Sequence, residues 1–122
     1  PSNMSLFFES GKTGAAPRHL RRAEEFIRAH AAKPLTLLDI AEAAGIAPRT
    51  LQHAYSRAFG MSPMRALTRE RMRRVRFELI AAQGSRSVTD VAVEWGFTHL
   101  GRFAADYRRE FGERPSETAR RG

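Results

Sequence analysis

The chain of 122 residues has no cysteine, one tryptophan and only two lysines. The absence of cysteine excludes a disulfide scaffold and any thiolate metal site, so nothing in the sequence favours an oxidising compartment. No apolar run approaches the roughly 20 residues that a membrane-spanning helix needs, and the N-terminus lacks the apolar core of a signal peptide. We therefore expect a soluble, cytoplasmic protein.

Motifs that are typical of enzymes are also missing. No G-x-S-x-G, H-E-x-x-H or G-x-x-x-x-G-K pattern occurs, and the four histidines do not have the spacing of metal ligands. We expect no catalytic residue, no metal ion and no cofactor. The sequence thus favours a binding protein over an enzyme.

Acidic residues are in the minority, with 13 Asp and Glu against 21 Lys and Arg, which gives a net charge of +8 and a pI of about 11.3. Nineteen of the 21 basic residues are arginine, whose planar guanidinium matches phosphates and guanine edges. This charge indicates a polyanionic partner, with nucleic acid as the leading candidate. An acidic protein or an anionic membrane surface remains the alternative.

The most informative pattern is an internal repeat. The segment TLLDIAEAAGIAPRTLQHAYSRAFGMSP at 36–63 reappears as SVTDVAVEWGFTHLGRFAADYRREFGERP at 87–115, with one extra residue after the shared glycine. Each copy predicts a short helix that ends at a glycine, a tight turn, and a longer helix that ends at a second glycine. This is the pattern of a helix-turn-helix, and the chain contains two of them.

Both copies carry the same signals for the start and the end of their first helix. Thr36-x-x-Asp39 and Ser87-x-x-Asp90 match a capping box with Asp in the position that Glu usually takes. Gly45 and Gly96 stand where the end of a helix requires a left-handed backbone.

The repeat divides the chain into parts. We interpret residues 1–16 as a flexible arm or linker whose first three residues resemble a cloning remnant, and residues 17–122 as one helical domain. Within this domain we place the first helix-turn-helix in 17–62, a linker helix at 63–83 and the second helix-turn-helix in 86–122.

The linker helix has a length that suits a spacer. About 20 residues at about 1.5 Å each give about 30 Å, close to the roughly 34 Å that separates successive major-groove faces of B-DNA. Its apolar stripe is predicted to contain Met64, Leu67, Met72, Val75 and Leu79.

These features resemble the DNA-binding domain of the AraC/XylS family of bacterial transcription regulators. The resemblance covers about Pro17 to Gly122 and is carried by DIAEAAGIAPRTLQHAYSRAFGMSP, the basic linker helix, and DVAVEWGFTHLGRFAADYRREFGERPSET. It implies an all-α fold of about seven helices, in which two helix-turn-helix subdomains are joined by a linker helix. It also implies that two recognition helices enter adjacent segments of the DNA major groove.

The resemblance further implies a sequence-specific regulator of transcription, with activation more common than repression and RNA polymerase as the protein partner. Oligomerisation would take place through a domain that these residues do not contain, and we expect the chain to be a piece of a longer regulator. The alternative is a basic helical module that binds a protein or a membrane without reading DNA sequence.

The first recognition helix is predicted from about Pro48 to Phe59, with Leu51, Tyr55 and Phe59 facing inward. The outward side chains predicted to contact DNA are Arg49, Thr50, Gln52, His53 and Arg57. The resemblance places Arg49, Gln52 and His53 at base edges, where Gln52 suits adenine and Arg49 suits guanine or phosphate. His53 stands where many relatives carry arginine, and Arg57 is better placed for phosphate.

The second recognition helix is predicted from about Thr98 to Phe111, with Phe103, Tyr107 and Phe111 facing inward. Its predicted DNA contacts are His99, Leu100, Gly101, Arg102, Ala105 and Arg108. Arg102 and Arg108 are expected to meet backbone or bases, whereas Leu100 and Ala105 can touch thymine methyl groups. Ala104-Ala105 replaces the Ser-Arg pair of many relatives, so this half is expected to depend more on DNA shape.

Three arginines of the linker helix are candidate phosphate contacts, namely Arg65, Arg69 and Arg73. The alternative for these arginines is a solvated face or intrahelical pairs with Glu70 and Glu78.

Overall fold

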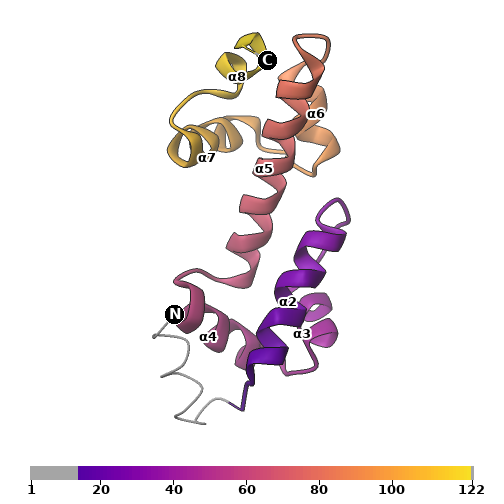
Figure 1. Cartoon of the computed structure of the whole chain (residues 1–122), viewed down its shortest axis with the longest axis vertical. Helices are drawn as coiled ribbons and strands as arrows, with labels where there is room; N and C mark the ends of the chain where they lie inside the picture. The colour runs from indigo at the N-terminus through magenta and orange to yellow at the C-terminus, as the bar shows by residue number, and fades with distance from the viewer. Residues whose placement is uncertain (1–13, 122) are drawn as a thin grey trace. The chain divides into compact units, whose positions relative to one another are not determined.

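The computed structural model describes residues 14–121, so most of the arm predicted at 1–16 lies outside the described residues. The described residues form seven α-helices and no strand, which confirms the all-α prediction (Figure 1). The helices belong to two compact units, of which the first ends at Thr68 and the second begins at Arg69. Within residues 14–121, every helix is too short or too polar to span a membrane.

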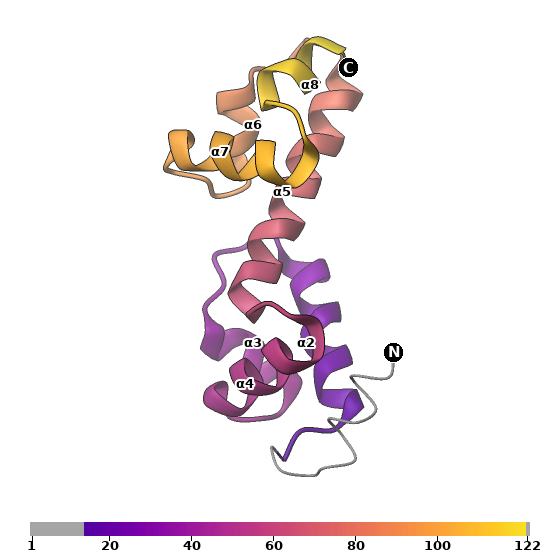
Figure 2. The ribbon, with the colours of Figure 1, turned by 90° about the vertical axis from the view of Figure 1, so that its left-hand side faces the viewer.

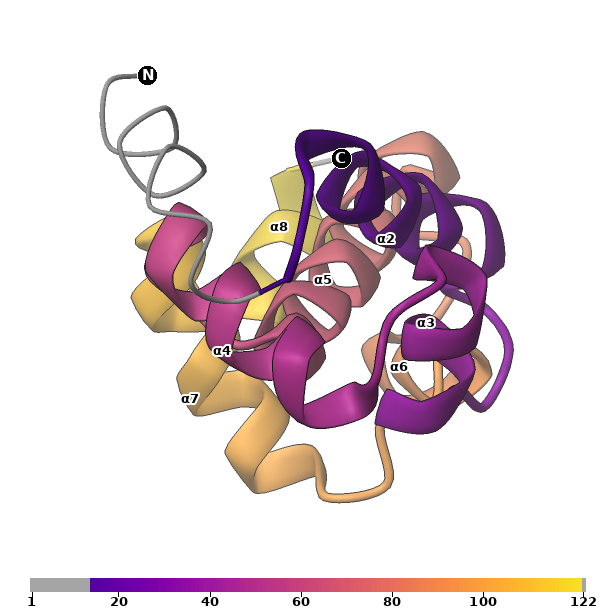
Figure 3. The same cartoon turned by 90° about the horizontal axis from the view of Figure 1, so that it is seen from below.

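The first unit contains α2 (Pro17–His30), α3 (Leu37–Ala44), α4 (Pro48–Phe59) and the start of α5 (Pro63–Ala82). Helix α2 packs against both α3 and α4, and a short turn joins α3 to α4 (Figure 3). Apolar side chains from all of these helices are fully buried between them, among them Leu20, Ile40, Leu51 and Leu67. Burial of one stripe per helix therefore decides which side of α4 faces solvent.

Helix α3 begins and ends as the sequence predicts. The Thr36 Oγ1 atom accepts a hydrogen bond from the Asp39 N–H at 3.1 Å, and the Asp39 carboxylate accepts one from the Thr36 N–H at 2.9 Å. At the other end Gly45 has φ of +83° and donates its N–H to the carbonyl of Ala41. A left-handed residue here lets α4 start after only three residues.

The second unit contains the rest of α5 with α6 (Val88–Glu94), α7 (Leu100–Phe111) and α8 (Pro115–Arg121), shown in Figure 2. Its buried core comprises Met72, Val75, Leu79, Val91, Ala92, Phe103 and Tyr107. Trp95, Phe97 and Phe111 pack against this core while keeping part of their surface exposed. Helix α7 thus faces the core with Phe103, Tyr107 and Phe111, which have the same four-residue spacing as Leu51, Tyr55 and Phe59 in α4.

The start of the second motif departs from the prediction in two ways. Helix α7 begins at Leu100 and not at Thr98, because α6 is one residue shorter than α3 and the turn also holds the extra residue of this copy. Only half of the second capping box is present in the described chain. Ser87 Oγ accepts from the Asp90 N–H at 3.0 Å, while the Asp90 side chain is exposed and returns no bond.

Helix α5 also differs from its prediction. It ends at Ala82, one residue early, because Gln83 takes φ of +51°. Met64 was predicted to lie on the apolar stripe but is 36% exposed. The reason is that α5 serves two separate cores, and among residues 63–68 only Pro63 and Leu67 are buried. The other four predicted stripe residues are buried.

Helix α8 is attached to α7 by a buried polar contact. The Tyr107 hydroxyl donates to Thr118 Oγ1 at 2.8 Å, and the Thr118 hydroxyl donates in turn to Glu113. The Thr118 hydroxyl, followed by Arg121, lowers the pKa of the Glu113 carboxyl. This chain of groups leaves the buried Thr118 side chain fully hydrogen-bonded.

We predict that Tyr107→Phe lowers the free energy of unfolding by about 1 kcal/mol, because the buried Thr118 oxygen loses a donor. The matched control is Tyr55→Phe, since Tyr55 occupies the equivalent place in the first unit and its hydroxyl makes no hydrogen bond within residues 14–121. Urea unfolding followed by circular dichroism measures both variants. Equal losses in the two variants would contradict the role of the Thr118 contact.

Candidate nucleic-acid interface

Helix α4 presents the predicted residues on its solvent side. Leu51, Ala54 and Tyr55 are buried, and this leaves Arg49, Gln52, His53 and Arg57 exposed and Thr50 half-buried. Within the described residues no hydrogen bond or ion pair engages Arg49, Gln52 or His53. These side chains are therefore available to a ligand.

Helix α7 presents the second predicted set. Phe103 and Tyr107 are buried, and the exposed residues include His99, Leu100, Gly101, Arg102, Ala105 and Arg108. His99 precedes the helix as its N-cap residue. Asp106 forms an ion pair with Arg109 on the same helix, whereas Arg102 and Arg108 have no partner in the described part of the chain.

The N-termini of α4 and α7 differ from those of the other helices. Neither Ala47 nor His99 caps its helix with a side chain. The five other described helices each have a side-chain hydrogen bond at this end, from His19, Thr36 with Asp39, Ser62, Ser87 and Glu117. The first N–H groups of α4 and α7 therefore remain open to solvent, where the helix dipole favours an anion.

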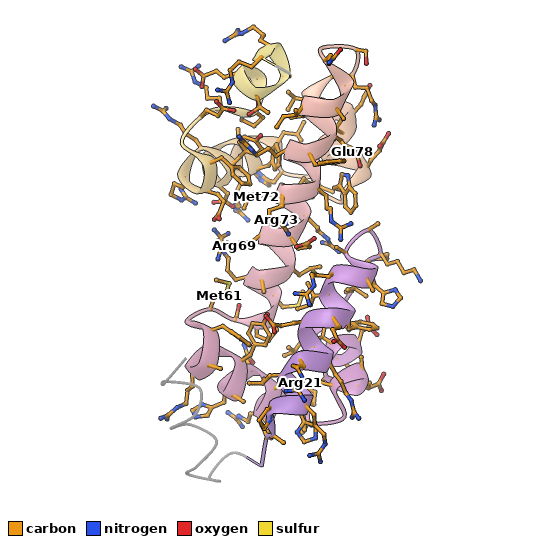
Figure 4. The ribbon with its side chains drawn as sticks, viewed as in Figure 1. Arg21, Met61, Arg69, Met72, Arg73 and Glu78 are labelled. Carbon is orange, nitrogen blue, oxygen red and sulfur yellow. The ribbon has the colours of Figure 1, made fainter. Side chains whose placement is uncertain are left out.

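The linker arginines are engaged by carboxylates. Arg69 donates to the Glu110 carboxylate on α7 through Nε at 3.1 Å and Nη2 at 2.6 Å. Arg73 and Arg74 both pair with Glu70, whose side chain is almost buried. This confirms the intrahelical pairing considered for Glu70 (Arg69 and Arg73 are labelled in Figure 4).

Glu78 makes two contacts outside its own helix. Its carboxylate pairs with Arg86 from the loop after α5 at 3.1 Å, and it accepts a hydrogen bond from the Trp95 indole N–H at 2.8 Å (Glu78 is labelled in Figure 4). Because Trp95 directly follows α6, Glu78 fixes the second turn to α5. The Arg69–Glu110 pair likewise fixes α7. Sequence reasoning missed Glu110, although a carboxylate on a basic helix is a signal for such a pair.

Charge is distributed unevenly in the first unit. Between residues 14 and 68 all four carboxylates, Glu24, Glu25, Asp39 and Glu42, belong to α2 and α3. Helix α4 carries two arginines and one histidine and no acid. Its solvent side therefore attracts an anionic partner without competition from its own carboxylates.

A family model for a helix-turn-helix domain matches residues 40–121 of the chain. A crystal structure of a probable AraC family transcriptional regulator from Rhodopseudomonas palustris is 38% identical, with a TM-score of 0.78, and the match covers 84% of this chain and 95% of that one. The chain belongs to the AraC/XylS family. The resemblance inferred from the sequence is confirmed, and α4 and α7 are the helices that the sequence predicts as recognition helices.

Two curated relatives of this AraC-type chain are named as regulators. A probable thc operon regulatory protein of Rhodococcus erythropolis is 41% identical over 107 residues, which are 87% of this chain and 32% of that protein. An XylDLEGF operon transcriptional activator of Pseudomonas putida is 38% identical over 98 residues, which are 80% of this chain and 62% of that protein. The chain thus spans less than two thirds of either relative.

His19 lies beside the first turn and closes the N-terminus of α2. Its Nδ1 atom accepts a hydrogen bond from the Ala16 N–H at 2.8 Å, a role that a Glu or Gln side chain usually performs. Burial, followed by the charges of Arg18 and Arg22, lowers the pKa of His19 from its ordinary value of 6.5. The neutral ring is therefore the form that the fold favours.

We predict that the unfolding free energy of the AraC-type domain falls as the pH drops below about 6.5, because the unfolded chain then binds more protons than the folded one. His19→Gln retains an acceptor for the Ala16 N–H at every pH and should lose less stability than the unchanged protein between about pH 7.5 and about pH 5.5. Urea unfolding at the two pH values measures this difference. His19→Ala, which has no acceptor, should be less stable than His19→Gln at both, and identical pH losses in all three proteins would refute the cap.

Proposed function

We propose that the chain is the part of an AraC-type regulator that recognises a specific DNA duplex, with α4 and α7 inserted into two neighbouring segments of the major groove. The observation that carries this proposal is the pair of recognition helices in folded copies of one motif. Each presents exposed side chains that have no partner within residues 14–121, which are Arg49, Gln52 and His53 in α4 and Arg102 and Arg108 in α7.

In α4 the chemistry of the exposed side chains assigns the roles. Gln52 is suited to pair through its amide with an adenine edge, and Arg49 with a guanine edge or a phosphate. His53 contacts a base edge next to them, with Thr50 beside it. Arg57 lies in the last turn of α4, where a phosphate contact is expected to orient the helix without reading sequence.

In α7 the exposed set is less polar. Leu100 is 36% exposed and, with Ala105, is suited to contact thymine methyl groups. Arg102 and Arg108 meet bases or backbone, and His99 and Gly101 allow the start of α7 to approach the groove closely. This half of the domain would depend more on DNA shape than α4 does.

Arg65, Arg69 and Arg73 of the linker helix are the further phosphate contacts of this proposal. Arg69 and Arg73 already pair with Glu110 and Glu70, and a carboxylate on each guanidinium weakens its attraction for a phosphate.

The relatives' names support a regulatory role for the longer protein. One is called an operon regulatory protein and the other an operon transcriptional activator. We propose that this chain acts in the same way on bacterial DNA in the cytoplasm, with RNA polymerase as its protein partner. A further domain of the regulator would supply oligomerisation.

Selection of tight binders from a random duplex library at about 150 mM salt tests the proposal. The expected result is two conserved sequence blocks centred about 10 base pairs apart, one for each recognition helix. A single block would mean that one helix has only a structural role. No enrichment would overturn sequence-specific recognition.

We predict that Gln52→Ala and Arg49→Ala each cost roughly 1 to 3 kcal/mol on the selected duplex and relax its sequence preference at one position. Arg57→Ala is the matched contrast from the same helix, since loss of a phosphate contact should weaken the selected and a shuffled duplex equally. Fluorescence anisotropy with both duplexes measures the dissociation constants. Uniform weakening by Gln52→Ala would remove it from the base-reading residues.

A further inference from the structure

A groove of about 610 Å³ opens on the first unit between the C-terminal half of α2 and helix α3. Its apolar lining includes Phe26, Leu35 and Ala43, and its charged lining consists of Lys33, Asp39 and Glu42. Two carboxylates and one ammonium group give this lining a net charge of −1. None of the lining residues belongs to α4. The groove is therefore separate from the side chains that we assign to DNA.

The helix before each motif allows the two units to be compared. In α2 the buried residues are Leu20, Ala23 and Ile27, and in α5 buried residues with the same spacing are Met72, Val75 and Leu79. The two helices correspond under a shift of 52 positions, since 72 − 20 = 52 and 79 − 27 = 52. Phe26 of the groove therefore corresponds to Glu78 of α5.

In the second unit an arginine fills the place of the groove. The motifs correspond under a shift of 51 positions, since 87 − 36 = 51 for the residues that cap their first helices. Leu35 thus corresponds to Arg86, and Ala43 corresponds to Glu94. The Arg86 guanidinium pairs with both Glu78 and Glu94. The first unit has leucine in place of this arginine, so its groove lacks the side chain that closes its counterpart.

Helix α5 carries an exposed apolar pair on its solvent side. Phe77 is 71% exposed, more than any other large apolar side chain among residues 14–121, and Ile80 is 44% exposed. Under the shift of 52 positions their counterparts on α2 are the charged residues Glu25 and Arg28. A helix in this place of the fold therefore does not require apolar residues at these two positions.

We propose that Phe77 and Ile80 of one chain dock into the groove of a second copy of the chain. Both surfaces are otherwise unexplained, and they have complementary shapes: an aromatic side chain that projects from a helix, and an apolar groove next to Phe26. A buried aromatic anchor is the usual centre of a protein interface.

The charges of the two surfaces are complementary as well. Helix α5 contains six arginines and two glutamates, which gives a net charge of +4, and three of these arginines lie within four residues of Phe77. Helix α3 contains Asp39 and Glu42 and no basic residue, which gives a net charge of −2. Glu42 is exposed and makes no ion pair within residues 14–121. Opposite charges on the two helices favour this pairing and oppose the pairing of two α5 helices or two α3 helices.

The contact joins different surfaces of the two copies, so it is head to tail. Each copy keeps a vacant groove or a vacant Phe77, and a third copy can therefore add in the same way. The contact is additional to oligomerisation through a further domain of the regulator.

The absence of cysteine allows the contact to be tested by disulfide cross-linking. Leu38 lies one turn before Glu42 on α3 and is 54% exposed, so Leu38→Cys places a thiol at the rim of the groove. Ile80→Cys places a thiol one turn after Phe77. The two variants are oxidised separately and as a mixture, without DNA, and the disulfide-linked dimer is measured by non-reducing electrophoresis. The mixture should form several-fold more dimer than either variant alone, because a head-to-tail contact brings position 38 of one copy to position 80 of the other.

Two further substitutions should each remove this excess, namely Glu42→Arg in the Leu38→Cys chain and Phe77→Ser in the Ile80→Cys chain. Their matched controls should retain it. Glu25→Arg makes the same charge change on an exposed position of α2, and Val93→Ser removes another exposed apolar side chain. Circular dichroism melting checks that all of the variants fold.

The proposal is overturned if the mixture forms no more dimer than the separate variants, in which case a second copy is not the occupant of the groove. It is also overturned if the excess survives Glu42→Arg and Phe77→Ser. Because DNA is absent from the experiment, the result does not depend on the proposed function.

Discussion

The tight turn between the two helices of each motif is the constraint on which the rest of the structure depends. Gly45 and Gly96 both take a positive φ, of +83° and +90°, which a residue with a Cβ atom rarely adopts. The turn directs α4 and α7 across the helices before them, and the burial of Leu51 and Phe103 then fixes their rotation. Everything that faces outward on the two recognition helices follows from this geometry.

The two copies stabilise the same arrangement by different chemistry. The residue before the turn glycine is Ala44 in the first unit, where it is fully buried, and Trp95 in the second, where it hydrogen-bonds to Glu78. The second unit adds the Arg69–Glu110 pair. It thus has more polar contacts that position its recognition helix and fewer polar side chains on that helix to read bases. This combination is consistent with our proposal that α4 reads the DNA sequence and α7 depends more on DNA shape.

Much of the fold could be predicted because its signals are local. The hydroxyl of Thr36 marks the start of α3, and the spacing of Leu51 and Tyr55 acts within one or two turns of α4, which has the predicted bounds. The predictions for the start of α7 and for Met64 were wrong because they required knowledge of neighbouring segments. The extra residue of the second turn delays α7, and α5 turns from one core to another along its length. The candidate DNA contacts were predicted in the same local way, from positions left outward by an apolar stripe.

The sequence by itself determined the duplicated motif, the helical class, the family and the outward sets on α4 and α7, because repetition and periodicity are properties of the chain alone. Only the tertiary structure decided which charged side chains are occupied and which are available. From the sequence alone, Arg69 and Arg73 cannot be distinguished from Arg49 and Arg102. Their difference arises from carboxylates on other turns and other helices, which the fold alone brings within reach of a guanidinium.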